Sequence, residues 1–363
     1  MAEKKKKGFG RFLFGLTART FMLMNAGVLV MSYLSMYINP AKAWFMTIFG
    51  LLFIVFFIVN VILLLWALRR HSGAAVIPLL ALLPSIFLIG RYVQFSGRDD
   101  APEGAVTLID YNVGKFSMYP SHSRLADRES CRDSVLAYLR TTDADIICLQ
   151  EFRAPKGVDV REYLAEVMPG YNSEYYTNIT GLGPYGNVIL SRFPVVGRGK
   201  FDFDESANMA LYADLDIGGK VMRVYDCHFE SYSLSLPRLV KAFASREDDK
   251  VQEAEEKMRT SITRRPQQVD IVLQDIRNSP VESIVTGDFN DTPMSFTYQQ
   301  LKKGKKDSFI EAGKGLGGTY SGLWPFIRID YVLYPEKCEA VYHKVVRKKY
   351  SDHYPIVTRL KIN

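Results

Sequence analysis

The pattern of hydrophobic positions changes about a quarter of the way along the chain. Long apolar runs dominate residues 1–95, whereas short apolar runs alternate with polar stretches in residues 105–363. The segment between them, residues 96–104, reads SGRDDAPEG and is rich in residues that favour turns. The pattern therefore predicts an N-terminal membrane anchor, a linker and a folded domain, in that order.

Three apolar runs in the anchor are candidate transmembrane helices, at about residues 21–38, 43–68 and 74–92. A spanning helix needs about 20 predominantly apolar residues. The second run contains no charged residue, whereas the third contains Pro78 and Pro84 and reaches spanning length only if its terminal arginine reaches back to the interface. The sequence thus predicts two or three spans and an interaction with the lipid bilayer.

The cations predict an orientation in an inner or plasma membrane. Lysines and arginines precede the first run, and Arg69 and Arg70 follow the second. Because cytoplasmic loops carry an excess of Lys and Arg, the N-terminus and the loop at residues 69–71 are expected in the cytoplasm. Three spans place the folded domain outside the cytoplasm, which we expect, and two leave it inside. A signal peptide cleaved near Ala41–Ala43 is the alternative to an anchor.

The folded domain shows the signals of a mixed α+β protein with two packed sheets. Eight runs rich in Val, Ile, Leu or Tyr predict strands at 105–113, 144–152, 186–195, 210–217, 220–230, 282–290, 329–335 and 355–362. Helical spacing of apolar residues predicts a helix within 123–143. The stretch 236–276 is also helical in pattern, but Pro266 predicts two helices or one broken helix there.

Charge and cysteine content narrow the functional classes. The first 98 residues hold 11 Lys or Arg and one acid, whereas the rest of the chain holds 35 basic and 38 acidic residues. The folded domain is therefore slightly acidic, which is not typical of a protein that binds nucleic acid avidly. The four cysteines have no metal-binding spacing and are expected to be buried thiols, with one disulfide as the alternative.

Polar residues fall at the C-terminal ends of several predicted strands. They are Asn112, Glu151, His228, Asp288 and Asn290. Because strand ends converge at one edge of a sheet layer, we expect these side chains to meet in one place. Carboxylate and amide oxygens are the ligands that Mg²⁺ prefers.

The runs that carry these residues resemble the endonuclease/exonuclease/phosphatase superfamily, whose fold is that of deoxyribonuclease I. The resemblance starts near Val106 and keeps the family order YNV, CLQE, GNVILSRFP, CHFES, GDFNDTP, RIDYVLYP and SDHYPIV. It implies a four-layered α/β/β/α sandwich, preceded here by two or three transmembrane helices. It also implies hydrolysis of phosphoesters with Mg²⁺ or Mn²⁺.

The resemblance assigns a ligand set for the metal and a contact for the phosphate. Glu151 is the main metal ligand that it implies, Asn112 supplies or positions a nearby oxygen, and Asp352 joins directly or through water. Asn187 is a further phosphate contact.

The remaining implied roles are catalytic. Asp288 activates the attacking water and Asn290 orients it and contacts phosphate. His353 and His228 hydrogen-bond the phosphoryl oxygens, and Asp330 pairs with His353 and fixes its tautomer. In the same loops and the preceding helix, Asp291, Arg265 and Gln268 are expected to support the scaffold.

The sequence supports three hypotheses about the function. The first is a membrane-anchored phosphodiesterase that acts on a lipid head group or another small phosphoester. The second is a nuclease that acts on nucleic acid. A non-catalytic membrane scaffold is the remote third, because the metal-binding and water-activating residues are all present. No protein partner is predicted.

Overall fold

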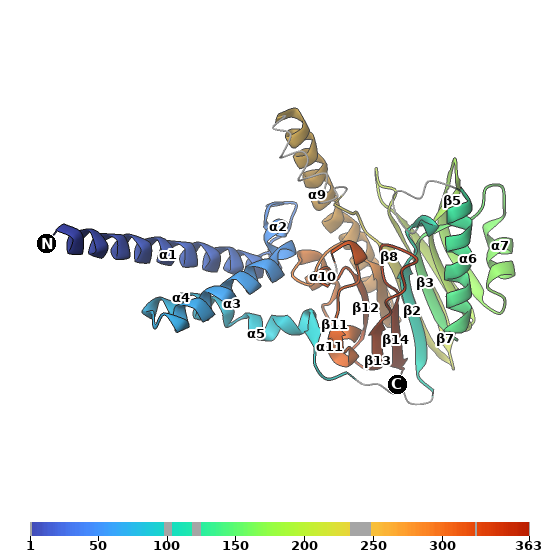
Figure 1. Cartoon of the computed structure of the whole chain (residues 1–363). Helices are drawn as coiled ribbons and strands as arrows, with labels where there is room; N and C mark the ends of the chain where they lie inside the picture. The colour runs from blue at the N-terminus through green and yellow to red at the C-terminus, as the bar shows by residue number, and fades with distance from the viewer. Residues whose placement is uncertain (1, 98–103, 118–124, 233–247, 324, 363) are drawn as a thin grey trace. The chain divides into compact units, whose positions relative to one another are not determined.

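The computed structural model describes residues 2–97, 104–117, 125–232, 248–323 and 325–362, so most of the predicted linker lies outside the described residues (Figure 1). It divides into two compact units. One comprises residues 1–90 with 294–296, and the other comprises residues 91–293 with 297–363.

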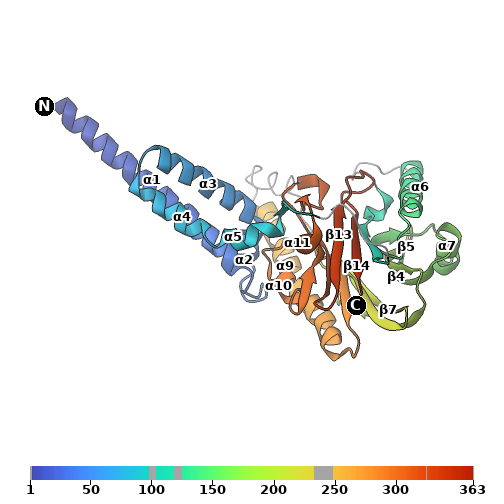
Figure 2. The same cartoon turned by 90° about the horizontal axis from the view of Figure 1, so that it is seen from below.

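The first unit is helical. Its elements are α1 (Ala2–Leu34), α2 (Met46–Leu51), α3 (Phe53–Arg69), η1 (Gly73–Ala75), α4 (Val76–Leu82), α5 (Ser85–Leu88) and the first two residues of η2 (Ile89–Arg91). Helix α1 packs against α3 and α4 (Figure 2). Two helical stretches, Phe14–Leu34 and Gly73–Arg91, are long and apolar enough to cross a membrane, and α3 is a shorter apolar helix.

The charge-free run 43–68 forms two helices rather than one, with the break at Leu52. The hydroxyl of Ser32 in α1 donates a hydrogen bond to the carbonyl of Phe49 at 2.7 Å. In a continuous helix that carbonyl would accept from the backbone four residues further on. Helix α1 thus supplies a hydrogen bond to the Phe49 carbonyl in place of the one that the break removes.

Polar side chains link the helices of this unit. The buried amide of Asn60 in α3 donates to the carbonyl of Asn25 in α1 at 3.0 Å, and the hydroxyl of Tyr33 donates to the carbonyl of Ala81 at 2.8 Å. Tyr33 also lies 2.6 Å from the hydroxyl of Ser85. Such bonds between helices are typical of bundles whose outer surface is apolar.

The second unit contains two six-stranded sheets. In the first sheet the order is β13 (Glu339–Val345), β14 (Ile356–Lys361), β2 (Val106–Asn112), β3 (Ile146–Arg153), β5 (Gly183–Ser191) and β4 (Asn172–Thr180). In the second the order is β10 (Lys305–Asp307), β12 (Asp330–Pro335), β9 (Ser283–Asp288), β8 (Lys220–His228), β7 (Met209–Ile217) and β6 (Val195–Asp202). A short pair, β1 (Val93–Gln94) with β11 (Gly315–Leu316), completes the strands among the described residues.

The sheets pack face to face with helices outside, which is the expected four-layered sandwich of the deoxyribonuclease I-like fold. One apolar core contains residues of both sheets, such as Leu108 and Val224. A second core lies under α6 (Leu125–Thr141) and α7 (Val160–Val167), and a third under α9 (Asp248–Asn278) and α10 (Phe296–Leu301) (Figures 1 and 2). The short helices η3 (Gly114–Phe116), α11 (Ser308–Ala312) and η4 (Ser321–Leu323) lie in connections.

All eight predicted strands are present, and the four cysteines are buried free thiols as expected. Strands β4, β6 and β13 were not predicted, because their exposed and polar positions weaken the apolar signal, and the short strands β1, β10 and β11 were not predicted either. The expected break at Pro266 was wrong, since α9 continues through the proline. Buried residues on both sides of it, Ile262 and Val269, fix the helix and outweigh the lost backbone hydrogen bond.

The strand directions bring the predicted site residues to one edge of the sandwich. Strands β2 and β3 are parallel, as are β8 and β9, so their C-terminal ends lie together within each sheet. Strands β14 and β12 run antiparallel to β2 and β9, so their first residues lie at the same edge.

Candidate active site

The two sheets are linked at this edge by the side chains of Asn112 and Asp288. The amide nitrogen of Asn112, the last residue of β2, donates to Oδ2 of Asp288, the last residue of β9, at 2.9 Å. Both side chains are buried. The amide oxygen of Asn112 accepts from the backbone N–H of Gly114 at 3.0 Å, which fixes the orientation of the amide.

Asp288 is a buried acid of the site. Its oxygens accept from the backbone N–H of Asn290 at 2.8 Å and from the Asn290 amide at 3.2 Å. Burial raises the pKa of Asp288, the positive charge of His353 opposes this, and the carboxylate of Asp330 raises it further. The result is a carboxyl group whose pKa lies above the ordinary range, as is typical of a general base that works near neutral pH.

His353 and Asp330 form a buried hydrogen-bonded pair. Nδ1 of His353 lies 2.9 Å and 3.0 Å from the two oxygens of Asp330, and Nε2 lies 3.7 Å from Oδ2 of Asp288. Burial alone would lower the pKa of His353, but the two carboxylates outweigh it and raise that pKa well above its ordinary value. Asp330 is placed by strand pairing, because it lies directly opposite Asp288 in the register of β12 and β9.

Glu151 lies at an irregular point of β3, at the edge where the strand ends meet. The register of β3 with β5 shifts between Leu149 and Phe152, and Glu151 has a φ of 52°. Its carboxylate lies 3.3 Å from Nζ of Lys115 and 3.8 Å from Nε2 of His228. Burial would raise the pKa of Glu151, but the ammonium of Lys115 and the imidazole of His228, when it is protonated, outweigh burial and lower that pKa.

His228 joins the two acidic sides of the site. Its Nε2 lies 3.8 Å from the carboxylates of both Glu151 and Asp288. Burial is the main cause that lowers the pKa of His228, so the neutral imidazole is favoured. The Glu151 and Asp288 carboxylates therefore share one imidazole nitrogen as a neighbour, which places them in one site.

Asp352 and Asn290 lie at the same edge. The Asp352 carboxylate accepts from the Ser351 hydroxyl at 3.2 Å, and its Oδ1 is 3.0 Å from where a Cβ on Gly114 would be. Gly114 has a φ of 53°, so it permits both the left-handed turn and the close approach of Asp352. Asn290 has a φ of 50°, and its amide donates to the carbonyl of Phe229 at 2.9 Å.

Asn187 lies deeper than the other predicted residues. It is fully buried in β5, and its amide nitrogen is 3.5 Å from the carbonyls of Met209 and Asp226. Its side-chain oxygen has no hydrogen-bond partner among the described residues. The neighbouring Met209 pairs with His228 in the sheet, so Asn187 borders the site from within the sandwich.

The predicted metal ligands are of a chemical type that suits a hard divalent cation. Glu151 and Asp352 offer carboxylates and Asn112 offers an amide oxygen, which are the ligand types that Mg²⁺ and Mn²⁺ accept. Another group, Asp288, Asp330 and His353, has ligand atoms within 4.8 Å of one another. The Nδ1 atom of His353 already pairs with both oxygens of Asp330, which favours an acid–imidazole pair over a ligand set there.

The residues expected to support the scaffold connect α9 to two loops. The buried guanidinium of Arg265 lies 2.9 Å from Asp291 and donates to the carbonyl of Glu230 at 2.7 Å. Gln268 accepts from the backbone N–H of Glu230 at 2.7 Å. Helix α9 thus fixes the segments that follow both β8 and β9.

The sequence reasoning missed Lys115, Tyr185 and Arg153 beside Glu151. The Lys115 ammonium and the Arg153 guanidinium each lie 5.4 Å from the centroid of the Tyr185 ring. Tyr185 precedes Asn187 by two positions in β5, so both lie on the same face of the strand. For Tyr185 that spacing is a signal in the sequence, whereas the approach of Lys115 to Glu151 depends on the fold.

The sequence profile of the Endonuclease/Exonuclease/phosphatase family matches residues 111–353, more than half of the chain. The chain belongs to this family. Its members are phosphoester hydrolases that generally use a divalent metal. A second profile, described as a domain of unknown function (DUF8431), matches residues 12–92. No curated protein matches the chain.

Solved structures of this family share the fold. An endonuclease/exonuclease/phosphatase from Bacteroides vulgatus is 17% identical, with a TM-score of 0.52, over 72% of this chain and 100% of that chain. The human Nocturnin catalytic domain with bound sulfate anion is 16% identical, with a TM-score of 0.53, over 73% and 97%. D. rerio TDP2 complexed with single strand DNA product is 17% identical, with a TM-score of 0.50, over 72% and 100%.

Proposed function

We propose that the protein is a membrane-anchored, divalent-metal-dependent phosphodiesterase that hydrolyses a phospholipid head group or another small phosphoester. The observation that carries the proposal is the convergence of Asn112, Glu151, His228, Asp288 and His353 at one edge of the sandwich. Membership of a family of phosphoester hydrolases supports the reaction class.

Glu151, Asn112 and Asp352 would hold the metal. When bound, the cation polarises a phosphoryl oxygen and offsets the negative charge that develops on it. The left-handed backbone of Glu151 supports this assignment, because strained residues cluster at functional sites. Lys115, 3.3 Å from the same carboxylate, is then placed to attract the phosphate.

Asp288 would take a proton from the attacking water as the new oxygen–phosphorus bond forms and the bond to the leaving oxygen breaks. Its raised pKa suits that role, and the amides of Asn112 and Asn290 hold its carboxylate in place. Asn290 would also orient the water and contact phosphate.

His353, paired with Asp330, would donate a hydrogen bond to the phosphoryl oxygen as a charged imidazolium. His228, whose pKa is lowered, would do so as a neutral imidazole. We assign Asn187 as a further phosphate contact.

Membrane anchorage is supported by the surface of the helical unit. Large apolar side chains such as Phe21, Ile62 and Phe87 are exposed along its helices. A soluble monomer rarely exposes so many in one region. We place the helical unit in an inner or plasma membrane, where phospholipid head groups are the most abundant phosphodiesters.

Hydrolysis of nucleic acid is the alternative, and the likeness to TDP2 with its single strand DNA product favours it. The slight excess of acids over residues 99–363 favours the lipid.

The test is a comparison of two substrates. The full-length protein in mild detergent is given mixed phospholipid vesicles or single-stranded DNA, each with Mg²⁺ or with a chelator. We expect head-group release only with the metal, and loss of at least 100-fold in kcat for Asp288→Asn. Asp270→Asn, an exposed residue of α9, is the matched control and should keep full activity. Metal-dependent cleavage of DNA alone would select the nuclease, and unchanged turnover in Asp288→Asn would reject the mechanism.

A further inference from the structure

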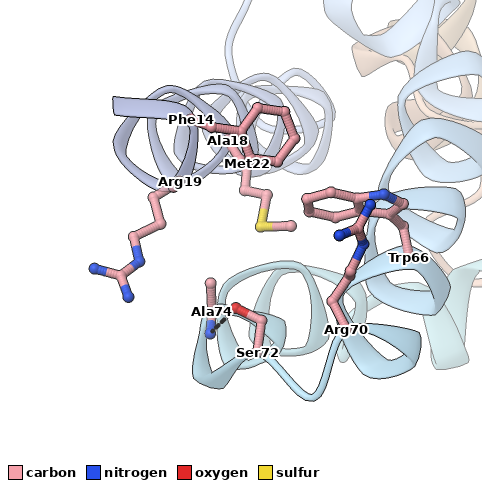
Figure 3. A pocket seen from close by; sticks show the side chains of 9 residues that line it. Phe14, Ala18, Arg19, Met22, Trp66, Arg70, Ser72 and Ala74 are labelled. Atoms are coloured by element: carbon pink, nitrogen blue, oxygen red, sulfur yellow. Dashed lines mark hydrogen bonds between the residues drawn. The ribbon is translucent and has the colours of Figure 1, made fainter. Parts of the chain in front are cut away.

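An open cavity of about 270 Å³ lies at the surface of the helical unit, between α1, the end of α3 and the turn that leads into α4. Figure 3 shows the side chains that surround it. They come from residues 14–22 and 66–74, two segments that are distant in the sequence and meet only in the folded chain. The cavity belongs to neither the predicted site nor the sandwich.

One part of the cavity wall is apolar. The rings of Phe14 and Trp66 meet edge to face with centroids 6.2 Å apart, and Met22 is buried between the helices. Trp66 is the kind of residue that is enriched where a membrane meets water. These side chains offer a surface for carbon chains rather than for a hydrated ion.

The other part of the wall is basic and polar. Arg19 of α1, Arg70 after α3 and the hydroxyl of Ser72 line the same cavity. In Figure 3 the two arginines lie on opposite sides, with Ser72 and Ala74 between them. The Arg70 guanidinium lies 5.7 Å from the centroid of the Trp66 ring, which holds it at the boundary of the two parts.

No carboxylate of the helical sequence is placed to neutralise these arginines. Residues 14–90 contain no Asp or Glu. The only acid before them, Glu3, is 16 positions from Arg19 in the continuous helix α1, which is about 24 Å along the axis. Both arginines are exposed, and with no acid in this stretch of the chain they are accessible to an anion from another molecule.

We propose that this cavity binds the phosphate and glycerol part of an anionic membrane phospholipid. Guanidinium groups and a hydroxyl suit phosphate oxygens, and basic pockets between membrane helices on the cytoplasmic side are suited to acidic head groups. A volume of about 270 Å³ corresponds to roughly nine water molecules, enough for that part while the acyl chains stay in the bilayer. The inference rests on the proposed membrane anchorage but not on the catalytic reaction.

The test measures lipid binding by native mass spectrometry of the full-length protein in mild detergent. The protein carries Asp288→Asn, so that no lipid is consumed during the titration. We expect phosphatidylglycerol to bind more tightly than phosphatidylcholine. Arg19→Gln and Arg70→Gln should each weaken phosphatidylglycerol binding about fivefold, as expected for one cation beside an anionic lipid.

Matched variants separate the cavity from general surface charge. Arg69→Gln removes the neighbouring cation, which does not line the cavity, and should change binding less than twofold. Arg70→Lys keeps the charge and should retain most of the affinity, which guards against a merely misfolded Arg70→Gln. Millimolar inorganic phosphate should leave the bound lipid in place.

Three results would overturn the proposal. They are equal binding of the two lipids, an effect of Arg69→Gln as large as that of Arg70→Gln, and displacement of the lipid by inorganic phosphate. Extraction of the chain from membranes by alkaline carbonate would remove the anchorage on which the inference rests and would also overturn it. The vesicle assay with the native Asp288 tests the proposed hydrolysis separately from this binding experiment, so failure of one proposal can be told from failure of the other.

Discussion

The separate roles of His353 and Asp330 follow from their hydrogen bonding. Nδ1 of His353 lies 2.9 Å and 3.0 Å from the two carboxylate oxygens of Asp330. The carboxylate fixes the tautomer and leaves Nε2 directed toward the region of Asp288, 3.7 Å away. Asp330 itself faces no substrate in the proposed mechanism. It acts through the imidazole as a positioning residue.

Replacing Asp330 with Asn should lower kcat roughly 100-fold or more, because the imidazolium loses its partner where charge accumulates. The pH profile gives a specific check. Asp330 raises the pKa of His353, so Asp330→Asn lowers it. A donor that must be protonated is lost as the pH rises through its pKa, so the alkaline limb of kcat should move to lower pH. A variant with reduced kcat and an unshifted limb would assign Asp330 a structural role only.

Lys115 offers a second test at the level of single residues. Its ammonium lies 3.3 Å from Glu151 and over the ring of Tyr185, so it places positive charge beside a proposed metal ligand. Lys115→Met should raise KM several-fold with a smaller change in kcat, because it weakens phosphate attraction rather than the reacting groups. The Mg²⁺ concentration for half-maximal activity should fall or stay constant, since a like charge near the metal is removed. A rise in that concentration would contradict this view of Lys115.

Among the elements, α9 has the clearest structural task, because its buried Arg265 reaches the loops after both β8 and β9. Arg265→Met should lower the free energy of unfolding by about 3–5 kcal/mol, since it leaves Asp291 buried without its partner. Urea unfolding followed by circular dichroism measures this. Arg264→Met, at an exposed pair with Glu205, is the control and should change stability by less than about 1 kcal/mol. The double variant Arg265→Met with Asp291→Leu should recover much of the loss, and no recovery would speak against an ion-pair origin.

The elements also show what a sequence pattern can and cannot predict. Strands β2, β3, β8 and β9 were predictable because they are buried on both faces and read as apolar runs that end in a polar residue. Strand β6 alternates between partly buried and exposed residues and holds two glycines, so its strand signal is weak. Helix α9 crosses Pro266 because packing on the sheet, which no local pattern contains, decides the outcome.

The same limit applies to the site. The polar residues at strand ends were predictable, because the ends of parallel strands meet at one edge. The pairing of Asp330 with Asp288 across β12 and β9 depends on register, which one sequence does not contain. The neighbours of Glu151 were missed for a similar reason. Lys115 lies on a turn with left-handed backbone, and only the fold brings that turn over Tyr185.

For the whole molecule, the number of spans decides on which side of the membrane the catalytic unit works. Two helical stretches have spanning length and composition, Phe14–Leu34 and Gly73–Arg91. Helix α3 has 17 residues, about 25 Å, which is near the lower limit for a hydrocarbon core of about 30 Å. Arg69 and Arg70 at its end can reach the interface and make up the difference. We therefore expect three spans, with the N-terminus and the loop at residues 69–71 in the cytoplasm.

Reporter fusions after residue 363 test this topology in the intact protein. Alkaline phosphatase is active only outside the cytoplasm. A green fluorescent protein fluoresces in the cytoplasm but not when it is carried across the membrane in unfolded form. Three spans predict high phosphatase activity and little fluorescence at the C-terminus. A fusion placed after Arg70 should give the opposite pair, because that loop carries the cations that stay inside. Fluorescence at both positions would leave Phe14–Leu34 and α3 as the only spans. Hydrolysis would then be directed at the cytoplasmic leaflet.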